Sequence, residues 1–100
     1  MQTTIQNQDG KIVVFLEGRL DTAAAPETEQ ALKPLYDSTE AEITLDCTKL
    51  VYISSSGLRL FLSLLKAAKA KGGHVYIHGI NEDLRKIFQL TGFINLFEFN

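Results

Sequence analysis

Three consecutive serines, Ser54, Ser55 and Ser56, stand before Gly57 in the middle of the chain. They follow an apolar run and open the longest helical pattern in the sequence, where a chain leaving a sheet would turn into a helix. The first N–H groups of a helix lack internal partners and carry a partial positive charge. A serine oxygen can accept from these groups, and a phosphate can be held by them. The serines therefore predict a helix cap and, as a second interpretation, a phosphate-binding or phosphorylation site.

The sequence lacks the usual constellations of an enzyme or a metal site. No glycine-rich phosphate loop occurs, and Ile53 stands where the first glycine of a Gly-x-Ser-x-Gly elbow would be. A serine triad would need His74 or His78 as its base, but we expect His74 at the wrong end of its strand and nothing else supports His78. On a strand the two histidines would lie roughly 13 Å apart, too far to share one metal ion. We therefore expect no enzymatic activity, no metal and no cofactor.

Composition predicts one globular domain over residues 1–100. The chain is 45% hydrophobic and 22% charged, and its net charge of −2 argues against a nucleic-acid partner. No segment approaches the ~20 apolar residues of a membrane span, and no secretion signal opens the chain. Cys47 is the only cysteine, which excludes an internal disulfide and favours a cytosolic location. We expect Cys47 to be a small buried side chain rather than a nucleophile.

Hydrophobic patterns predict strands separated by turns. The predicted strands are residues 3–8, 12–16, 43–47 and 74–78. Asp9-Gly10 is a two-residue hairpin signal, and the first strand reads as a weak edge strand. The continuous apolar run from Ile12 to Leu16 favours a central strand buried on both faces. We expect residues 18–22 and 48–57 to be loops, with Asp46 closing the third strand.

Helical patterns follow Pro26, Ser56 and Asn81. Pro34 removes a helix hydrogen bond, which predicts a kink there or an end to the first helix near Lys33. In the helix from Ser56 to Lys71, one stripe of residues should face the sheet, with Leu60 and Leu64 beside it. That stripe is Leu58, Phe61, Leu62, Leu65 and Ala68. After the third helix, the apolar residues Leu96, Phe97 and Phe99 predict a short strand or an apolar tail.

The order of these elements predicts a small α/β domain. After the N-terminal hairpin, strands alternate with helices, which favours a mixed, mainly parallel sheet of about four to five strands with about three to four helices. Loops at the carboxyl ends of parallel strands collect on one rim, where ligands usually bind. We therefore expect Asp21, Ser54, Ser55, Ser56 and Asn81 to gather at one edge of the domain.

Four segments of the sequence resemble the STAS domain family. They are Gly18-Arg19-Leu20-Asp21-Thr22, Leu45-Asp46, the stretch from Tyr52 to Arg59, and Leu90-Thr91-Gly92-Phe93. More narrowly, the chain is similar to the stand-alone anti-sigma factor antagonists of bacteria. The resemblance covers nearly the whole chain, and the serine stretch is specific because it occurs together with the upstream Gly-Arg-Leu-Asp segment.

The resemblance implies a phosphorylation-controlled partner switch. An unphosphorylated antagonist binds an anti-sigma factor, usually also a serine kinase of GHKL type, and thereby frees a sigma factor. The kinase phosphorylates the antagonist and weakens the complex, and a PP2C-type phosphatase reverses this. By position the acceptor is Ser55, with Ser54 and Ser56 as alternatives, and the family's acidic residue before the acceptor is replaced here by Ser54. The residues implied around the site, or in contact with the partner, are Asp21, Thr22, Ser54, Ser56, Gly57, Arg59 and Asn81.

Two other classes of function remain open on the sequence. One is a non-phosphorylated STAS scaffold subunit of a transport or stress-signalling complex. The other is a small-ligand or nucleotide-binding domain that uses the same rim. For the leading interpretation, the partner switch, we expect a monomer or a weak dimer.

Overall fold

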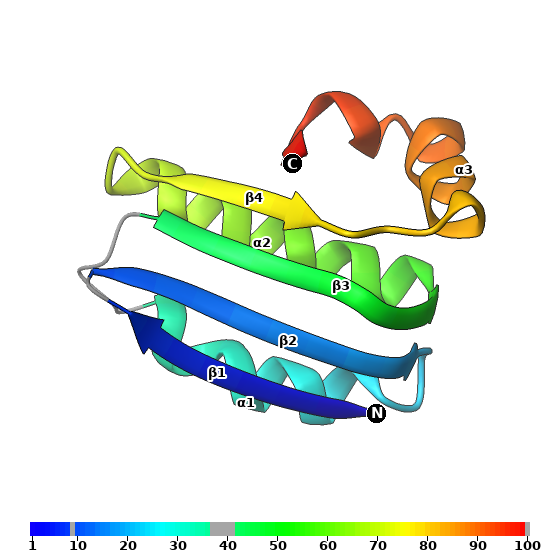
Figure 1. Cartoon of the computed structure of the whole chain (residues 1–100), viewed down its shortest axis with the longest axis horizontal. Coiled ribbons are helices and arrows are strands. Elements are labelled where there is room, and N and C mark those ends of the chain that lie inside the picture. The colour runs from blue at the N-terminus through cyan, green and yellow to red at the C-terminus, as the bar shows by residue number, and fades with distance from the viewer. Residues whose placement is uncertain (9, 37–41, 100) are drawn as a thin grey trace.

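The computed structural model describes residues 1–8, 10–36 and 42–99 as a five-stranded sheet with helices on one side (Figure 1). The elements in chain order are β1 (Gln2–Gln8), β2 (Lys11–Leu20), α1 (Ala25–Tyr36), β3 (Glu42–Ile53), α2 (Ser55–Ala70), β4 (His74–His78), α3 (Glu82–Thr91), the 3-10 turn η1 (Phe93–Asn95) and β5 (Glu98–Phe99). Neighbours in the sheet follow chain order from β1 to β5. Only the β1–β2 pair is antiparallel among the described strands, so the predicted mixed, mainly parallel sheet is confirmed.

The N-terminal hairpin and the short final strand are also as predicted. Gln8 pairs with Lys11 in the register of β1 and β2, which leaves Asp9-Gly10 as the two-residue connection. Gly10 has a φ of 81°, a conformation that glycine adopts without steric cost. Asp9 itself lies outside the described residues. Phe99 pairs with Ile77, so the apolar tail ends as a strand at the edge of the sheet.

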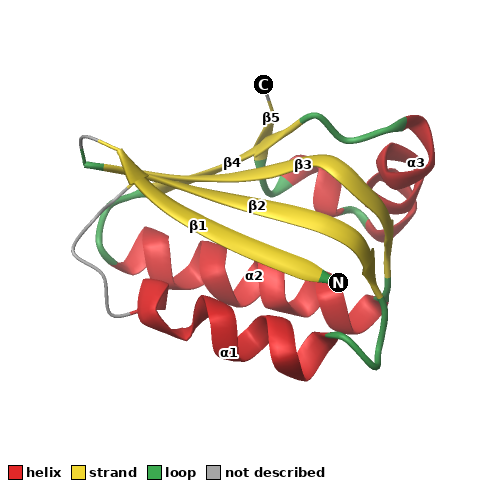
Figure 2. Cartoon of the chain, turned by 60° about the horizontal axis from the view of Figure 1, so that its bottom comes forward, coloured by secondary structure: helices red, strands yellow, loops and turns green. Residues whose placement is uncertain are grey.

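Helices α1 and α2 cover one face of the sheet (Figure 2). Alternate residues of β2 point to these helices and are fully buried, among them Val14 and Leu16. Val13 and Phe15 point to the opposite face and are only half-buried. The expectation that this strand is buried on both faces is therefore wrong, because both long helices lie on the same side of the sheet.

The strands β2 and β3 are longer than predicted. Strand β2 includes Gly18, Arg19 and Leu20, and β3 continues past Asp46 to Ile53, so the predicted loops over 18–22 and 48–57 begin too early. Two β-bulges account for the error in β3. Its register against β2 advances by an extra residue between the pairs Phe15–Asp46 and Glu17–Lys49, and again between Gly18–Leu50 and Arg19–Tyr52. A bulge of this kind places two residues opposite one and interrupts the alternation of faces.

Two expectations about the helices can also be compared with the structure. Of the two outcomes predicted at Pro34, an end near Lys33 is excluded, because α1 runs through Pro34 to Tyr36 and Leu32 and Leu35 anchor its last turns in the core; a kink at Pro34 stays a prediction. In α2, Leu60 and Leu64 are buried while Leu62 is half-buried. The buried stripe is wider than predicted because α2 packs against α1 as well as against the sheet.

Candidate functional site

Ser54 connects the ends of two strands to the start of α2. Leu20 and Ile53 are paired at the ends of β2 and β3, and the amide of Ser54 donates to the carbonyl oxygen of Leu20 at 2.9 Å. The backbone of Ser54 is extended, with φ −90° and ψ 173°. Its Oγ accepts from the amide of Gly57 at 3.2 Å, and its carbonyl oxygen accepts from Leu58 at 2.9 Å. Ser54 is therefore the N-cap, and the helix-cap prediction is confirmed at this residue.

Gly57 allows the first turn of α2 to pack directly on the strand ends. A Cβ atom built at this position would lie 2.7 Å from Cγ of Leu20 and 2.8 Å from Cγ1 of Ile53. Both neighbours are fully buried branched side chains that cannot retreat into solvent. The glycine is needed here for the close approach of helix and sheet, and this contact fixes where the preceding serines lie.

The three serine side chains have different exposures. Ser54 is 8% exposed and its oxygen is occupied by the cap. Ser55 is the first residue of α2 and is exposed, and Ser56 is intermediate. Among these three hydroxyl groups, that of Ser55 is the most accessible to an incoming enzyme.

Asp21 forms the turn that follows β2 and starts α1. Its Oδ1 accepts from the amide of Ala24 at 2.9 Å, and its carbonyl oxygen accepts from Ala24 and Ala25 at 3.2 and 3.1 Å. Since Asp21 follows Leu20 directly, this turn begins next to the residue that holds Ser54. Thr22 is exposed in the same turn. The segments 18–22 and 52–59 thus meet at one point of the fold.

A groove of about 390 Å³ runs between the first turns of α1 and α2. We call it the α1–α2 groove, and it is lined by Thr22, Ala25, Pro26, Glu29, Ser56, Arg59, Leu60 and Ser63. Glu29 comes from α1 and Arg59 from α2, so the groove carries one charge of each sign. Of the predicted site residues, Thr22, Ser56 and Arg59 lie in this groove, immediately beside Ser55.

Asn81 has a structural role at the start of α3. Its Oδ1 accepts from the amide of Leu84 at 2.8 Å, and its Nδ2 lies 3.5 Å from the carbonyl oxygen of Leu50. Figure 1 shows the start of α3 at the same end of the molecule as the start of α2. Within the described ranges, no hydrogen bond joins Asn81 to the serines. Its predicted place around the phosphorylation site stays a prediction.

Sequence reasoning missed a cation held beside the serine run. The guanidinium of Arg19 lies over the ring of Tyr52, 4.5 Å from its centroid, and the two residues are register partners in β2 and β3. Placing Arg19 in a loop concealed this pair. The pair could not be predicted from the two residue types, because Tyr52 lies opposite Arg19 only as a result of the second bulge in β3.

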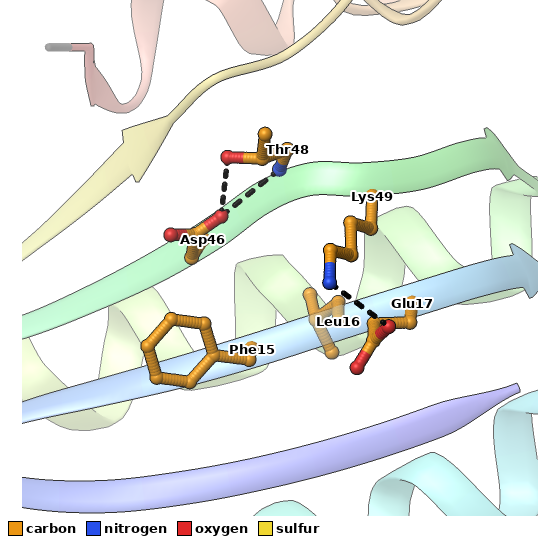
Figure 3. A pocket seen from close by; sticks show the side chains of 6 residues that line it. All are labelled: Phe15, Leu16, Glu17, Asp46, Thr48 and Lys49. Carbon is orange, nitrogen blue, oxygen red and sulfur yellow. Dashed lines mark hydrogen bonds and ion pairs between the residues drawn. The ribbon is translucent and has the colours of Figure 1, made fainter.

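A separate hollow of about 260 Å³ lies on the helix-free face of the sheet. Figure 3 shows its lining residues Phe15, Leu16, Glu17, Asp46, Thr48 and Lys49. The charged groups there already have partners: Lys49 pairs with Glu17 at 3.7 Å, and Asp46 accepts from the hydroxyl and amide of Thr48 at 2.6 and 3.0 Å. Asp46 thus stabilises the bulged part of β3 rather than ending the strand.

Other candidate chemical groups are His74, which pairs with Glu98, Cys47, which is buried, and His78, which is exposed at the end of β4. In the described part of the chain, no three His, Cys, Asp or Glu side chains cluster as metal ligands, and no helix is long and apolar enough to cross a membrane. Nδ1 of His74 lies 3.0 Å from Oε2 of Glu98. Burial, with a smaller contribution from the carboxylate of Asp46, raises the pKa of the Cys47 thiol to about 12. The prediction that Cys47 is a buried side chain is confirmed.

The five-stranded sheet with two long helices on one face is a fold already seen in solved structures. The Bacillus cell fate determinant SpoIIAA, solved in its phosphorylated form, matches with a TM-score of 0.76 over 99% of this chain and 91% of that chain. At 20% identity this likeness shows the shared fold.

The chain belongs to the STAS domain family, whose family model matches residues 2–100. It is 30% identical over 100 residues to the anti-sigma-B factor antagonist of Staphylococcus aureus, covering all of this chain and 91% of that protein. It is 31% identical over 97 residues to BtrV of Bordetella bronchiseptica, covering 97% of this chain and 84% of BtrV. The resemblance expected from the sequence is confirmed.

Proposed function

We propose that this chain is an anti-sigma factor antagonist that works as a phosphorylation-controlled partner switch. Unphosphorylated, it binds an anti-sigma factor and frees a sigma factor; phosphorylated on Ser55, it releases the anti-sigma factor. The observation that carries the proposal is the exposed hydroxyl of Ser55 at the start of α2, next to a buried Ser54 that caps the helix. The relative in Staphylococcus aureus is by name an anti-sigma-B factor antagonist.

The physical chemistry of the site supports switching without unfolding. A phosphate on Ser55 adds about −1.5 to −2 charges at a helix N-terminus, an end that tolerates an anion. The cap is not disturbed, because Ser54 and not Ser55 accepts from Gly57. In a close protein interface the same dianion brings repulsion and a desolvation cost. Phosphorylation would therefore change the partner rather than the fold.

The replacement of the family's acidic residue by Ser54 is compatible with this function. Aspartate and serine are about equally good N-cap residues, so the oxygen that accepts from Gly57 is retained. What is lost is one negative charge beside the acceptor. The loss of this charge would change how the kinase recognises the site, but it would not change the position or the exposure of Ser55.

The partners of this switch are those that the family resemblance implies. One partner is an anti-sigma factor that is also a GHKL-type serine kinase. The other is a separate PP2C-type phosphatase. Both would act in the cytoplasm, where sigma factors bind RNA polymerase. Asp21, Thr22, Ser56, Gly57 and Arg59 would form or shape the surface around the acceptor, and the chain would act without catalysis or cofactor, as a monomer or weak dimer.

Phosphopeptide mapping after incubation with the kinase and ATP tests the proposal. We expect a single phosphate on Ser55, lost in Ser55→Ala and retained in Ser54→Ala and Ser56→Ala. A complex that forms while all three serines stay unmodified would favour the non-phosphorylated scaffold instead. Titration with nucleotide alone tests the ligand-binding alternative, for which saturable binding to the isolated chain would be required.

A further inference from the structure

Arg59 stands one helical turn after Ser55 on the exposed side of α2. Residues four positions apart on a helix have Cβ atoms about 5–6 Å apart and can interact directly. Both side chains are exposed, so neither is held away from the other by packing. A phosphate on Ser55 would therefore come within reach of the guanidinium.

Arg59 has no carboxylate partner in the described part of the chain. The ion pairs found there join Lys11 to Glu42, Lys49 to Glu17 and His74 to Glu98. Glu29 lines the same α1–α2 groove from the opposite helix, but no ion pair joins it to Arg59 among the described residues. The guanidinium thus remains available for a new anion.

Arg19 and Lys66 are less suited than Arg59 to bind this phosphate. The guanidinium of Arg19 is already placed over the Tyr52 ring. Lys66 lies on α2 but roughly 16 Å further along the axis from Ser55, at 1.5 Å per residue. A planar guanidinium also matches phosphate oxygens with two parallel hydrogen bonds, which an ammonium group cannot do.

We propose that Arg59 binds the phosphate on Ser55 and leaves the α1–α2 groove when it does so, an inference that rests on the proposed phosphorylation of Ser55. The side chain of Arg59 would then have two positions, one for each phosphorylation state of Ser55. In the unphosphorylated chain Arg59 lines the groove, as Glu29 does from α1. In the phosphorylated chain it is held over the first turn of α2 by charge-assisted hydrogen bonds.

This movement would amplify the effect of the phosphate on partner binding. The site gains the phosphate dianion, and the groove at the same time loses its cation, leaving Glu29 as its charged side chain. A partner that contacts the groove with acidic or carbonyl oxygens would lose an attraction as well as meeting a repulsion. The arginine would also shield the phosphate from the phosphatase.

A 31P NMR titration of the full chain, with phosphoserine installed at position 55 during synthesis, tests this inference. The second ionisation of a phosphoserine lies near pH 6. We expect Arg59→Gln to raise that pKa by about half a pH unit, the scale of an exposed ion pair. Arg59→Lys should fall between, because it keeps the charge and loses the paired hydrogen bonds. Lys66→Gln, which removes the same charge from the same helix, should match the parent chain.

A second readout is the rate of dephosphorylation by the phosphatase. We expect Arg59→Gln to lose its phosphate roughly threefold faster, in proportion to the freed fraction of phosphate, and Lys66→Gln to be unchanged. Equal pKa values in the parent and Arg59→Gln chains, or an equal rise in Lys66→Gln, would overturn the inference. The phosphoserine is installed by synthesis, so the titration does not depend on the kinase. If the kinase did not phosphorylate Ser55, the proposed function would be refuted, but the result for Arg59 would still stand or fall on the titration alone.

Discussion

The amide of Ser54 donates to the carbonyl oxygen of Leu20 across 2.9 Å. This bond joins the end of β2 to the residue that caps α2. It brings the Gly18–Thr22 segment against the serine run, although some thirty residues separate them along the chain. The position of Ser55 is therefore set by the sheet and not by a flexible loop.

Replacing Ser54 and Ser55 by alanine should have different effects on stability. Ser54→Ala removes the oxygen that accepts from Gly57 and should lower the free energy of unfolding by about 1 kcal/mol. Ser55→Ala removes an exposed hydroxyl and should stay within about 0.5 kcal/mol of the parent chain. Urea denaturation of both variants checks this, and equal losses would contradict the assignment of the cap.

Charge at position 55 should control binding to the anti-sigma factor. We expect Ser55→Ala to bind as the parent chain does and Ser55→Asp to bind more weakly, by roughly tenfold, because a carboxylate would be buried in the interface. Ser55→Asn is the matched control, since it has the size of aspartate without its charge. Calorimetric titration measures all three, and equal affinities of the Ala and Asp variants would favour a scaffold.

Enlarging Gly57 should loosen the packing of α2 on the strand ends. The added Cβ of Gly57→Ala would press on Leu20 and Ile53 at 2.7 and 2.8 Å, an overpacking that costs about 1–3 kcal/mol. Better helix propensity returns up to about 1 kcal/mol of this. The net result should be a lower melting temperature. Ser63→Ala, at an exposed position of the same helix, should leave it unchanged or raise it slightly.

The buried thiol of Cys47 should make the fold sensitive to alkaline pH. Burial raises the pKa of Cys47 from 9.0 in the unfolded chain to about 12 in the folded one. Above pH 9 the unfolded chain therefore loses the thiol proton while the folded chain keeps it. Stability from this group is complete below pH 9 and is lost as the pH rises towards 12, with a slope of up to about 1.4 kcal/mol per pH unit.

Comparison with Cys47→Ala isolates this contribution. The pKa of Tyr36 is also raised, by burial and by Glu29, and its contribution is present in both chains. Between pH 9 and 11 the unfolding free energy of the parent should fall more steeply than that of the variant. Parallel pH profiles would show that Cys47 ionises as easily in the folded chain as in the unfolded one. A thiol reagent at pH 8 should likewise react slowly until urea unfolds the chain.

The sequence was informative where local pattern and burial agree. Alternation predicted the strand around Ile43 and Leu45, the Asp9-Gly10 signal predicted the hairpin, and Asn81 was correctly expected to cap α3. Each of these depends on residues within a few positions of one another. The serine run and the upstream Gly-Arg-Leu-Asp segment together, with the two other segments, then predicted the family, which no single local pattern could do.

The errors came from features that depend on register and on other elements. Burial in β3 falls at Ile43, Leu45 and Cys47, then at Leu50 and Ile53, so its period changes from two to three. Each bulge inserts a residue, and the residue types at Thr48 and Lys49 do not predict a bulge. The burial of Leu60 and Leu64 likewise required knowing that α1 lies beside α2. The α1–α2 groove arises from that same contact and could not be predicted.

The two bulges also determine where this chain tolerates changes of length. Residues 48–51 fall in the segment expected from the sequence to be a connecting loop, a kind of segment in which insertions and deletions are usually harmless. Here the extra residue of each bulge determines which of the following side chains of β3 face the core, so that Leu50 and Ile53 point inward. Deleting one of these extra residues would turn every following side chain of β3 to the opposite face of the sheet and expose Leu50 or Ile53 to water. The start of α2, which follows Ile53, would be displaced with them. This stretch, expected to be a loop, is therefore constrained in length by the register of β3 and by the burial of Leu50 and Ile53.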